Sequence, residues 1–203
     1  MSYWNTYYIN HPDNPPSAFA QTVVKRIGSR VLDLGCGNGR DSLLFAQSSK
    51  VVAVDNATQA LLSLQIARNA FNSMFDTDYL GLPLDIQTVH IDIITQKHIL
   101  EPIVQHVSSI YTRFLLHTIP HEHQGALLDL LFNNMRKGAY IFIECRSDNG
   151  VSPDDTHARW LVSKDMVKHY LKKYQIEYML CEECGLAPTD NEDPLIIRII
   201  GMK

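Results

Sequence analysis

The chain has 203 residues, of which 45% are hydrophobic, and a formal net charge of -4 at pH 7. This length can bury one sizeable core, so we expect a single domain spanning residues 1–203. The acidic balance and the lack of a basic tract argue against a nucleic-acid binder, because phosphates must be neutralised by Lys and Arg.

Residues 1–10 are aromatic and polar, without the apolar core of a signal peptide. No apolar run in the sequence approaches the length of a membrane span. We therefore expect a cytoplasmic protein without a membrane span.

Residues 1–28 precede the first predicted strand and begin with four aromatic side chains, Tyr3, Trp4, Tyr7 and Tyr8. A helix is predicted from residue 16 onward, since proline and serine suit a helix start.

A glycine-rich loop then follows an apolar strand over residues 30–34 and leads into a helix over residues 41–47. Glycines allow a sharp turn and close approach of a ligand, and the helix start offers unpaired N–H groups. A second apolar strand, residues 51–54, ends at Asp55, where α/β nucleotide-binding folds hold ribose hydroxyls. Asn56 follows it and is a further candidate for cofactor binding.

The rest of the chain continues this alternation. We predict helices over residues 57–71, 120–135 and 164–174, a loop over 72–85, and strands over 87–91, 107–111, 139–145, 176–184 and 195–200. Alternation predicts an α/β fold with a mainly parallel sheet, helices on both faces and the ligand at the carboxyl ends of the strands. The terminal strand pair, joined without a helix, predicts one antiparallel strand at the sheet edge.

The spacing of the glycines separates this loop from the dinucleotide fingerprint G-x-G-x-x-G. Here Gly35, Gly37 and Gly39 alternate, and Asp33 precedes them within the strand. A pyrophosphate does not need that acid, whereas a ligand with a cationic amino-acid end would. The segment resembles the first motif of class I S-adenosylmethionine-dependent methyltransferases. This resemblance implies a Rossmann-like, doubly wound, mostly parallel seven-stranded sheet with an antiparallel last strand, and S-adenosylmethionine as cofactor.

The resemblance also implies roles for residues at the tips of successive strands. Asp33 would take the methionine ammonium, and the backbone at Gly35 and Gly37 would allow close approach. Asp92, at the end of the third strand, would accept a hydrogen bond from the adenine amino group, with Ile93 packing on the ring.

In the same resemblance, residues 1–28 fold over the cofactor as a lid. Tyr7 and Tyr8 would then pack against the adenosine or the sulfonium, because an aromatic face attracts a cation by ~0.5–2 kcal/mol. The alternative is that Trp4 and Phe19 only anchor this segment to the core.

The segment after the fourth strand lines the acceptor side of the site in this family. Arg113 and His117 are therefore candidate catalytic residues, and His117 would act as general base on a hydroxyl acceptor. The alternative is that His117 only satisfies backbone groups near the next helix.

Charged residues gather after the fifth strand. Arg146 and Arg159 could hold an anionic acceptor, because guanidinium groups match phosphate or carboxylate oxygens in a two-pronged way. His157 and Glu144 are further candidates for substrate binding. The alternative is a surface network in which Glu144 and Asp148 pair with these two arginines.

A metal site is not predicted, although His117, His121, Glu122 and His123 lie close together in sequence. Pro120 interrupts any helix between the first two, and no carboxylate cluster completes an octahedral site. A solvated helix start is the preferred interpretation.

Short motifs resemble a subgroup encoded with surface-polysaccharide genes for O-antigen or capsule. They include Arg113-Phe114 with His117 and the sequence Glu-Asp-Pro over residues 192–194. This narrower resemblance implies a small-molecule or glycan acceptor, with a kinase or glycosyltransferase as candidate partner.

Together these features predict methyl transfer from S-adenosylmethionine to an acceptor oxygen by in-line displacement. A phosphate or carboxylate would need no base, whereas a sugar hydroxyl would need one. Two alternatives stay open, an RNA or protein methyltransferase and a non-catalytic cofactor-binding module. An amino-group acceptor is disfavoured because no N-P-P-Y-type tetrapeptide follows the fourth strand.

Overall fold

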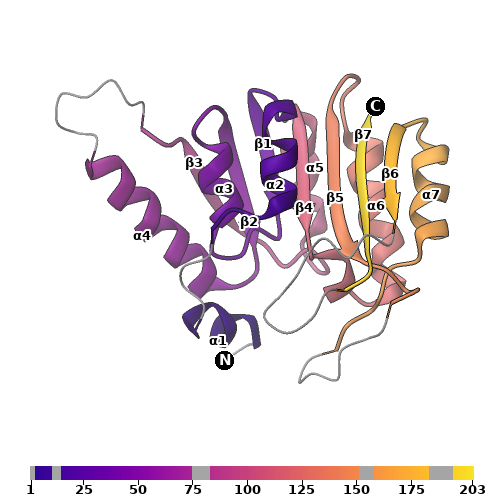
Figure 1. Cartoon of the computed structure of the whole chain (residues 1–203), viewed down its shortest axis with the longest axis horizontal. Coiled ribbons are helices and arrows are strands. Elements are labelled where there is room, and N and C mark those ends of the chain that lie inside the picture. Colours follow the sequence, from indigo (N-terminus) through magenta and orange to yellow (C-terminus); the bar gives the residue numbers. More distant parts are fainter. Residues whose placement is uncertain (1–2, 11–14, 75–82, 151–157, 183–193) are drawn as a thin grey trace.

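The computed structural model describes residues 3–10, 15–74, 83–150, 158–182 and 194–203. These residues form one seven-stranded sheet with the order β3-β2-β1-β4-β5-β7-β6 (Figure 1). The strands are β1 (Arg30–Leu34), β2 (Lys50–Asp55), β3 (Ile86–His90), β4 (Ser109–Arg113), β5 (Tyr140–Arg146), β6 (Glu177–Glu182) and β7 (Ile196–Met202).

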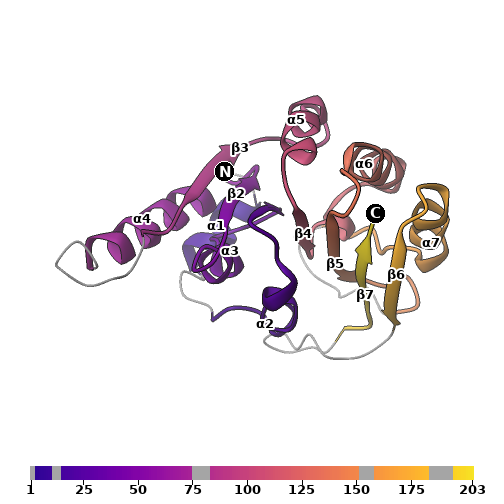
Figure 2. The same ribbon diagram turned by 90° about the horizontal axis from the view of Figure 1, so that it is seen from above.

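Helices cover both faces of the sheet (Figure 2). They are α1 (Tyr3–Asn10), α2 (Ala18–Val23), α3 (Arg40–Phe45), α4 (Thr58–Met74), α5 (Leu100–Gln105), α6 (His121–Asn134) and α7 (Lys164–Lys173), with 3-10 turns η1 (Val24–Arg26), η2 (Lys97–Ile99) and η3 (Leu116–Thr118). Side chains of α2, α3 and α4 pack on one face of the sheet, and those of α5, α6 and α7 pack on the other.

The central strands explain this layering. Val31, Leu32 and Leu34 of β1 are buried, and their side chains divide between the two apolar clusters because successive residues point to opposite faces. A strand that is apolar on both faces is typical of a parallel sheet covered by helices. The predicted fold class is confirmed.

Two features of the sheet differ from the prediction. Strand β4 extends through Arg113 rather than ending at residue 111, because its last residues still pair with β5. Strand β7 is antiparallel, as predicted, but it lies between β5 and β6. The edge position predicted for the antiparallel strand is therefore wrong, since pairing β7 on both sides satisfies its backbone groups.

The aromatic segment near the amino terminus forms a helix that the sequence did not predict. Figure 1 shows α1 at the edge of the sheet where the parallel strands end. It contacts α4, and the amide of Gln59 donates to Oδ1 of Asn5 at 3.1 Å. Asn5 thus satisfies an N–H group in the first turn of α4. Within the described part of the chain, no helix is long and apolar enough to cross a membrane.

Candidate active site

The glycine loop leaves β1 at the carboxyl edge of the sheet. The amides of Gly35 and Cys36 both donate to the carbonyl of Val54, at 2.8 and 3.0 Å, which fixes the loop against β2. Gly37 has a φ of +55°, and a Cβ at this position would collide with the Tyr8 hydroxyl. Tyr8 of α1 therefore lies directly against the loop.

Asp55 ties the loop to the end of β2. One carboxyl oxygen accepts from the amide of Gly37 and the other from that of Ala57, each at 2.8 Å. Burial raises the pKa of Asp55, and these backbone hydrogen bonds partly offset the rise. Each oxygen has a second lone pair, so the group can still accept from a ligand hydroxyl. Asn56 follows and is exposed, and its carbonyl lies 3.0 Å from Nε2 of His90.

Asp33 is almost fully buried within β1, at 2% exposure. Ser42 donates to it at 2.6 Å from the second residue after the start of α3. Burial raises the pKa of Asp33 to about 8, although the Ser42 hydrogen bond opposes the rise. The carboxyl therefore holds its proton at neutral pH until a cation stabilises the ionised form.

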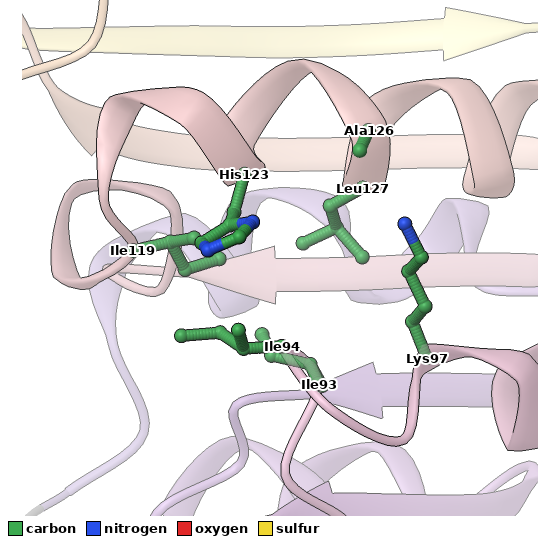
Figure 3. A pocket seen from close by; sticks show the side chains of 7 residues that line it. All are labelled: Ile93, Ile94, Lys97, Ile119, His123, Ala126 and Leu127. Atoms are coloured by element: carbon green, nitrogen blue, oxygen red, sulfur yellow. The ribbon is translucent and has the colours of Figure 1, made fainter.

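Asp92 shapes the segment that follows β3. Its carboxyl oxygens accept from the amide of Ile94 and the hydroxyl of Thr95, both at 2.9 Å. This turn directs Ile93 into a hollow between the segment and α6 (Figure 3). The hollow is shallow and small, and it is lined by Ile93, Ile94, Lys97, Ile119, His123, Ala126 and Leu127.

Arg113, Glu144 and Arg198 form a row across three neighbouring strands. Glu144 is 1% exposed and accepts from Nε of Arg113 at 2.7 Å and from Nε of Arg198 at 2.6 Å. The ion pairs of Glu144 are thus with these two residues, and the predicted pairing with Arg146 or Arg159 is wrong for Glu144. The cause is strand register, since Arg113 and Arg198 are its direct neighbours in β4 and β7.

Phe114 directly follows β4 and has a strained backbone conformation. Its φ of +55° is unusual for a bulky side chain, and its amide donates to the Glu144 carbonyl at 2.8 Å. The guanidinium carbon of Arg113 lies 4.1 Å from the centre of its ring, and that of Arg146 lies 5.9 Å away. Such strain is typical of functional sites.

His117 is buried beside this ring, with ring centroids 5.3 Å apart. Its Nδ1 accepts from the amide of Arg146 at 3.2 Å, and its carbonyl accepts from the amide of Trp160 at 2.8 Å. Because an amide can only donate, a neutral ring held in this way carries its proton on Nε2. In this tautomer Nε2 donates rather than accepts, which weighs against a base role.

The remaining predicted substrate residues lie near the end of β5. Arg146 is buried, and its carbonyl accepts from the amide of Val162, which brings residues 158–162 alongside. Arg159 is half-buried in that segment. His157 lies outside the described residues. On α1, Tyr7 contacts the ring of Tyr8 edge to face, at 5.2 Å between centroids.

A buried network near the loop was missed by the sequence analysis. Asp41 accepts from the amide and hydroxyl of Ser17, at 2.7 and 2.8 Å, and from the Tyr111 hydroxyl at 2.8 Å. Asp41, a residue of α3, thereby links the start of α2 to β4. Arg198 was also missed, because nothing in an apolar terminal strand marks which residue will lie beside Glu144. In the part of the chain that the structure describes, no group of three or more His, Cys, Asp or Glu could hold a metal ion.

Comparison with known proteins decides the family. Residues 25–184 match a family model described as a methyltransferase domain. The chain belongs to this methyltransferase family. S-adenosylmethionine is the cofactor that both the family and the glycine motif indicate. No curated protein matches the sequence.

Solved structures of methyltransferases share the fold. TehB from Haemophilus influenzae is similar with a TM-score of 0.73 and 18% identity over 98% of this chain and 67% of its own. A SAM-dependent methyltransferase from Aquifex aeolicus is similar with a TM-score of 0.62 and 16% identity, over 98% of this chain and 97% of its own. A SAM-dependent methyltransferase from Anabaena variabilis ATCC 29413 is similar with a TM-score of 0.69 and 15% identity, over 99% of this chain and 92% of its own. At these identities the likeness establishes the fold, and the narrower resemblance to polysaccharide-gene enzymes stays a prediction.

Proposed function

We propose that this methyltransferase transfers the methyl group of S-adenosylmethionine to an oxygen of a small molecule or glycan. The proposal rests on the convergence of Asp33, the glycine loop, Asp55 and Asp92 at the carboxyl ends of β1, β2 and β3. An oxygen acceptor is favoured because Arg113-Phe114 stands at the end of the fourth strand, where methyltransferases that act on amino groups carry an N-P-P-Y-type tetrapeptide.

The described residues fit this cofactor. Gly37 has no side chain where Tyr8 lies against the loop, and Asp55 keeps acceptor capacity for ribose hydroxyls. Asp33 would ionise beside the methionine ammonium. Asp92 would accept from the adenine amino group, with Ile93 in van der Waals contact; Ile93 also lines the hollow that faces α6 (Figure 3).

The cofactor supplies an electrophilic methyl group on its sulfonium. The protein's task is then to orient the acceptor in line with that methyl and to exclude water, and positioning of this kind supplies ~7–11 kcal/mol of the barrier. Tyr8 on α1 and Leu115 after β4 both approach the glycine loop. In this proposal Tyr8 and Leu115 limit the access of water on two sides of the donor.

The acceptor side allows two chemistries. A hydroxyl acceptor needs a base. For Nε2 of His117 to take the proton, the ring would have to give up the hydrogen bond that its Nδ1 accepts from the amide of Arg146 and carry its own proton on Nδ1 instead. A phosphate or carboxylate oxygen is already ionised and needs only positioning, which Arg146 and Arg159 could provide. The variant His117→Ala separates them, since it should be nearly silent with an anionic acceptor and severe with a hydroxyl.

The first experiment combines cofactor binding with label transfer. Calorimetry with S-adenosylhomocysteine tests binding, and methyl-labelled S-adenosylmethionine is then incubated with phosphorylated or uronic-acid sugars, with neutral sugars and with total RNA. Label in either sugar pool supports the proposal. Label only in RNA would overturn it, and binding without any transfer would favour the regulatory-module alternative.

A further inference from the structure

Two residues other than glycine have a left-handed backbone in the described part of the chain, Phe114 with a φ of +55° and Gln175 with a φ of +54°. This conformation is uncommon for any residue with a Cβ, and it is least expected for a bulky one. Each case needs its own structural reason, since such strain persists only where the surroundings impose it.

The backbone of Gln175 is explained by the end of α7. Its amide donates to the carbonyl of Lys172 at 3.1 Å, and the next amide, that of Ile176, donates to the carbonyl of Leu171 at 2.9 Å. This pair of hydrogen bonds is the Schellman motif, which ends many helices with a left-handed residue directly after the cap. The left-handed backbone of Gln175 thus serves to end a helix.

Phe114 has no helix before it, so helix termination does not explain its backbone. It directly follows β4, and its amide donates to the Glu144 carbonyl of β5 at 2.8 Å. The chain then turns at once, because the amide of Thr118 donates to the carbonyl of Leu115 at 2.8 Å and closes the turn η3. Phe114 is therefore the residue that joins the strand to the turn.

This turn brings Leu115 onto the glycine loop. Strands β1 and β4 pair in register, with Leu34 opposite Thr112, so their carboxyl ends lie side by side. A Cβ built on Gly35 would lie only 3.0 Å from Cβ and from Cδ1 of Leu115, which shows that the leucine packs directly on the glycine backbone. Because the carbonyl of Val54 in β2 accepts from the Gly35 amide at 2.8 Å, Leu115 restrains the same glycine from the opposite side, that of β4.

Contacts of the Phe114 ring hold the strained backbone in place. The guanidinium carbon of Arg113 lies 4.1 Å from the ring centre and that of Arg146 lies 5.9 Å from it. The ring of His117 meets it edge to face, with 5.3 Å between centroids. Attraction between a guanidinium and an aromatic face offsets the strain. A smaller side chain in the same conformation would keep the strain and lose these contacts.

We propose that Phe114 is a positioning residue for cofactor binding, because its left-handed backbone places Leu115 against Gly35 and so fixes the glycine loop that receives S-adenosylmethionine. Phe114 acts through Leu115 and the loop rather than by contact with the cofactor. This inference deepens the proposed function and rests on the cofactor named there. Gly35 has no side chain of its own to anchor it, so the position of Leu115 limits how far this part of the loop can move.

Alanine and glycine at position 114 separate the ring from the backbone. Phe114→Ala loses the ring contacts but keeps a Cβ, so its backbone should leave the left-handed region and carry Leu115 away from Gly35. Phe114→Gly loses the same contacts but can keep its φ without strain. The matched pair Gln175→Ala and Gln175→Gly makes equivalent changes at the end of α7. Calorimetry with S-adenosylhomocysteine measures affinity, and urea unfolding shows that each variant folds.

We expect Phe114→Ala to weaken S-adenosylhomocysteine binding about tenfold or more, whereas Phe114→Gly should bind within about threefold of the wild type. Both Gln175 variants should bind like the wild type. At each position the glycine variant should unfold at a higher urea concentration than the alanine variant, because only glycine takes a positive φ without strain. Glycine should thus restore affinity at position 114 alone.

Leu115→Ala added to Phe114→Gly tests the contact itself, and it does so even where Phe114→Ala does not fold. The added truncation should weaken S-adenosylhomocysteine binding about tenfold, because Gly35 loses the van der Waals contacts on its β4 side. Wild-type affinity in folded Phe114→Ala would overturn the inference, as would equal losses in Phe114→Ala and Phe114→Gly or no effect of Leu115→Ala. A wild type that does not bind S-adenosylhomocysteine would instead overturn the proposed function.

Discussion

The buried carboxyl of Asp33 couples protonation to folding. Its pKa in the folded protein is about 8, chiefly because burial disfavours the charged form. The unfolded chain would release this proton near pH 4. The contribution of Asp33 to the free energy of unfolding is therefore fully present below pH 4 and falls as the pH rises toward 8.

The variant Asp33→Asn should remove this dependence. Relative to the wild type, its free energy of unfolding should rise between pH 5 and pH 8, by at most about 1.4 kcal/mol per pH unit. Urea unfolding at both pH values measures the change. Asp85→Asn, which removes an exposed carboxyl, serves as control. Parallel stability curves for wild type and Asp33→Asn would contradict the prediction.

Gly37 combines a left-handed backbone with close contact to Tyr8. A methyl group there would collide with Tyr8 and displace the loop or α1, so Gly37→Ala should weaken S-adenosylhomocysteine binding at least tenfold. Gly138 is the matched control, because its φ is +79° but a Cβ there would meet nothing within 4 Å. Gly138→Ala should cost about 1 kcal/mol of stability and leave affinity unchanged. Calorimetric titration of both variants with S-adenosylhomocysteine measures the two affinities. Equal affinities would show that the ligand does not come close to Gly37.

At the scale of elements, Ser17 joins a helix cap to the site. Its hydroxyl accepts from the amide of Ala20 at 3.1 Å, which caps α2, and donates to Asp41 at 2.8 Å. One side chain thus both starts the helix and fixes it to α3. This explains why α2, only six residues long, holds a defined place on the sheet.

Comparison of two serine caps tests this double role. Ser163 caps α7 by accepting from the amide of Met166, and among the described residues its hydroxyl makes no second hydrogen bond like that of Ser17 with Asp41. We expect Ser163→Ala to cost about 1 kcal/mol and Ser17→Ala about 2–4 kcal/mol, because the latter also removes a buried hydrogen bond. Chemical denaturation gives both values. Equal losses would show that the contact with Asp41 adds nothing.

At the scale of the whole molecule, the candidate site joins the ends of separate strands with α1. Ligand binding should therefore stabilise the folded chain as a unit. S-adenosylhomocysteine at a hundred times its Kd should add about 2.7 kcal/mol. For a chain of this size we expect Tm to rise by about 5–10 °C. Thermal unfolding with and without the ligand measures this rise in Tm, which should be smaller for Gly37→Ala. An unchanged Tm of the wild type would contradict ligand binding.

The sequence by itself determined the features that depend on local order along the chain. Alternation of apolar strands and helices predicted the parallel sheet, and the spacing of Gly35, Gly37 and Gly39 after Asp33 predicted the cofactor loop. Asp55 and Asp92 could be placed because parallel strands end at one edge, so a residue's position in its strand already fixes where it lies.

Only the tertiary structure decided which side chains lie together at the ends of β4, β5 and β7. Arg198 lies beside Glu144 because β7 inserts antiparallel next to β5 in one register, and a shift of one residue would turn its side chain to the other face. The tautomer of His117 likewise depends on an amide 29 positions away in sequence. Pairings of this kind arise between segments brought together by folding, and no local pattern encodes them.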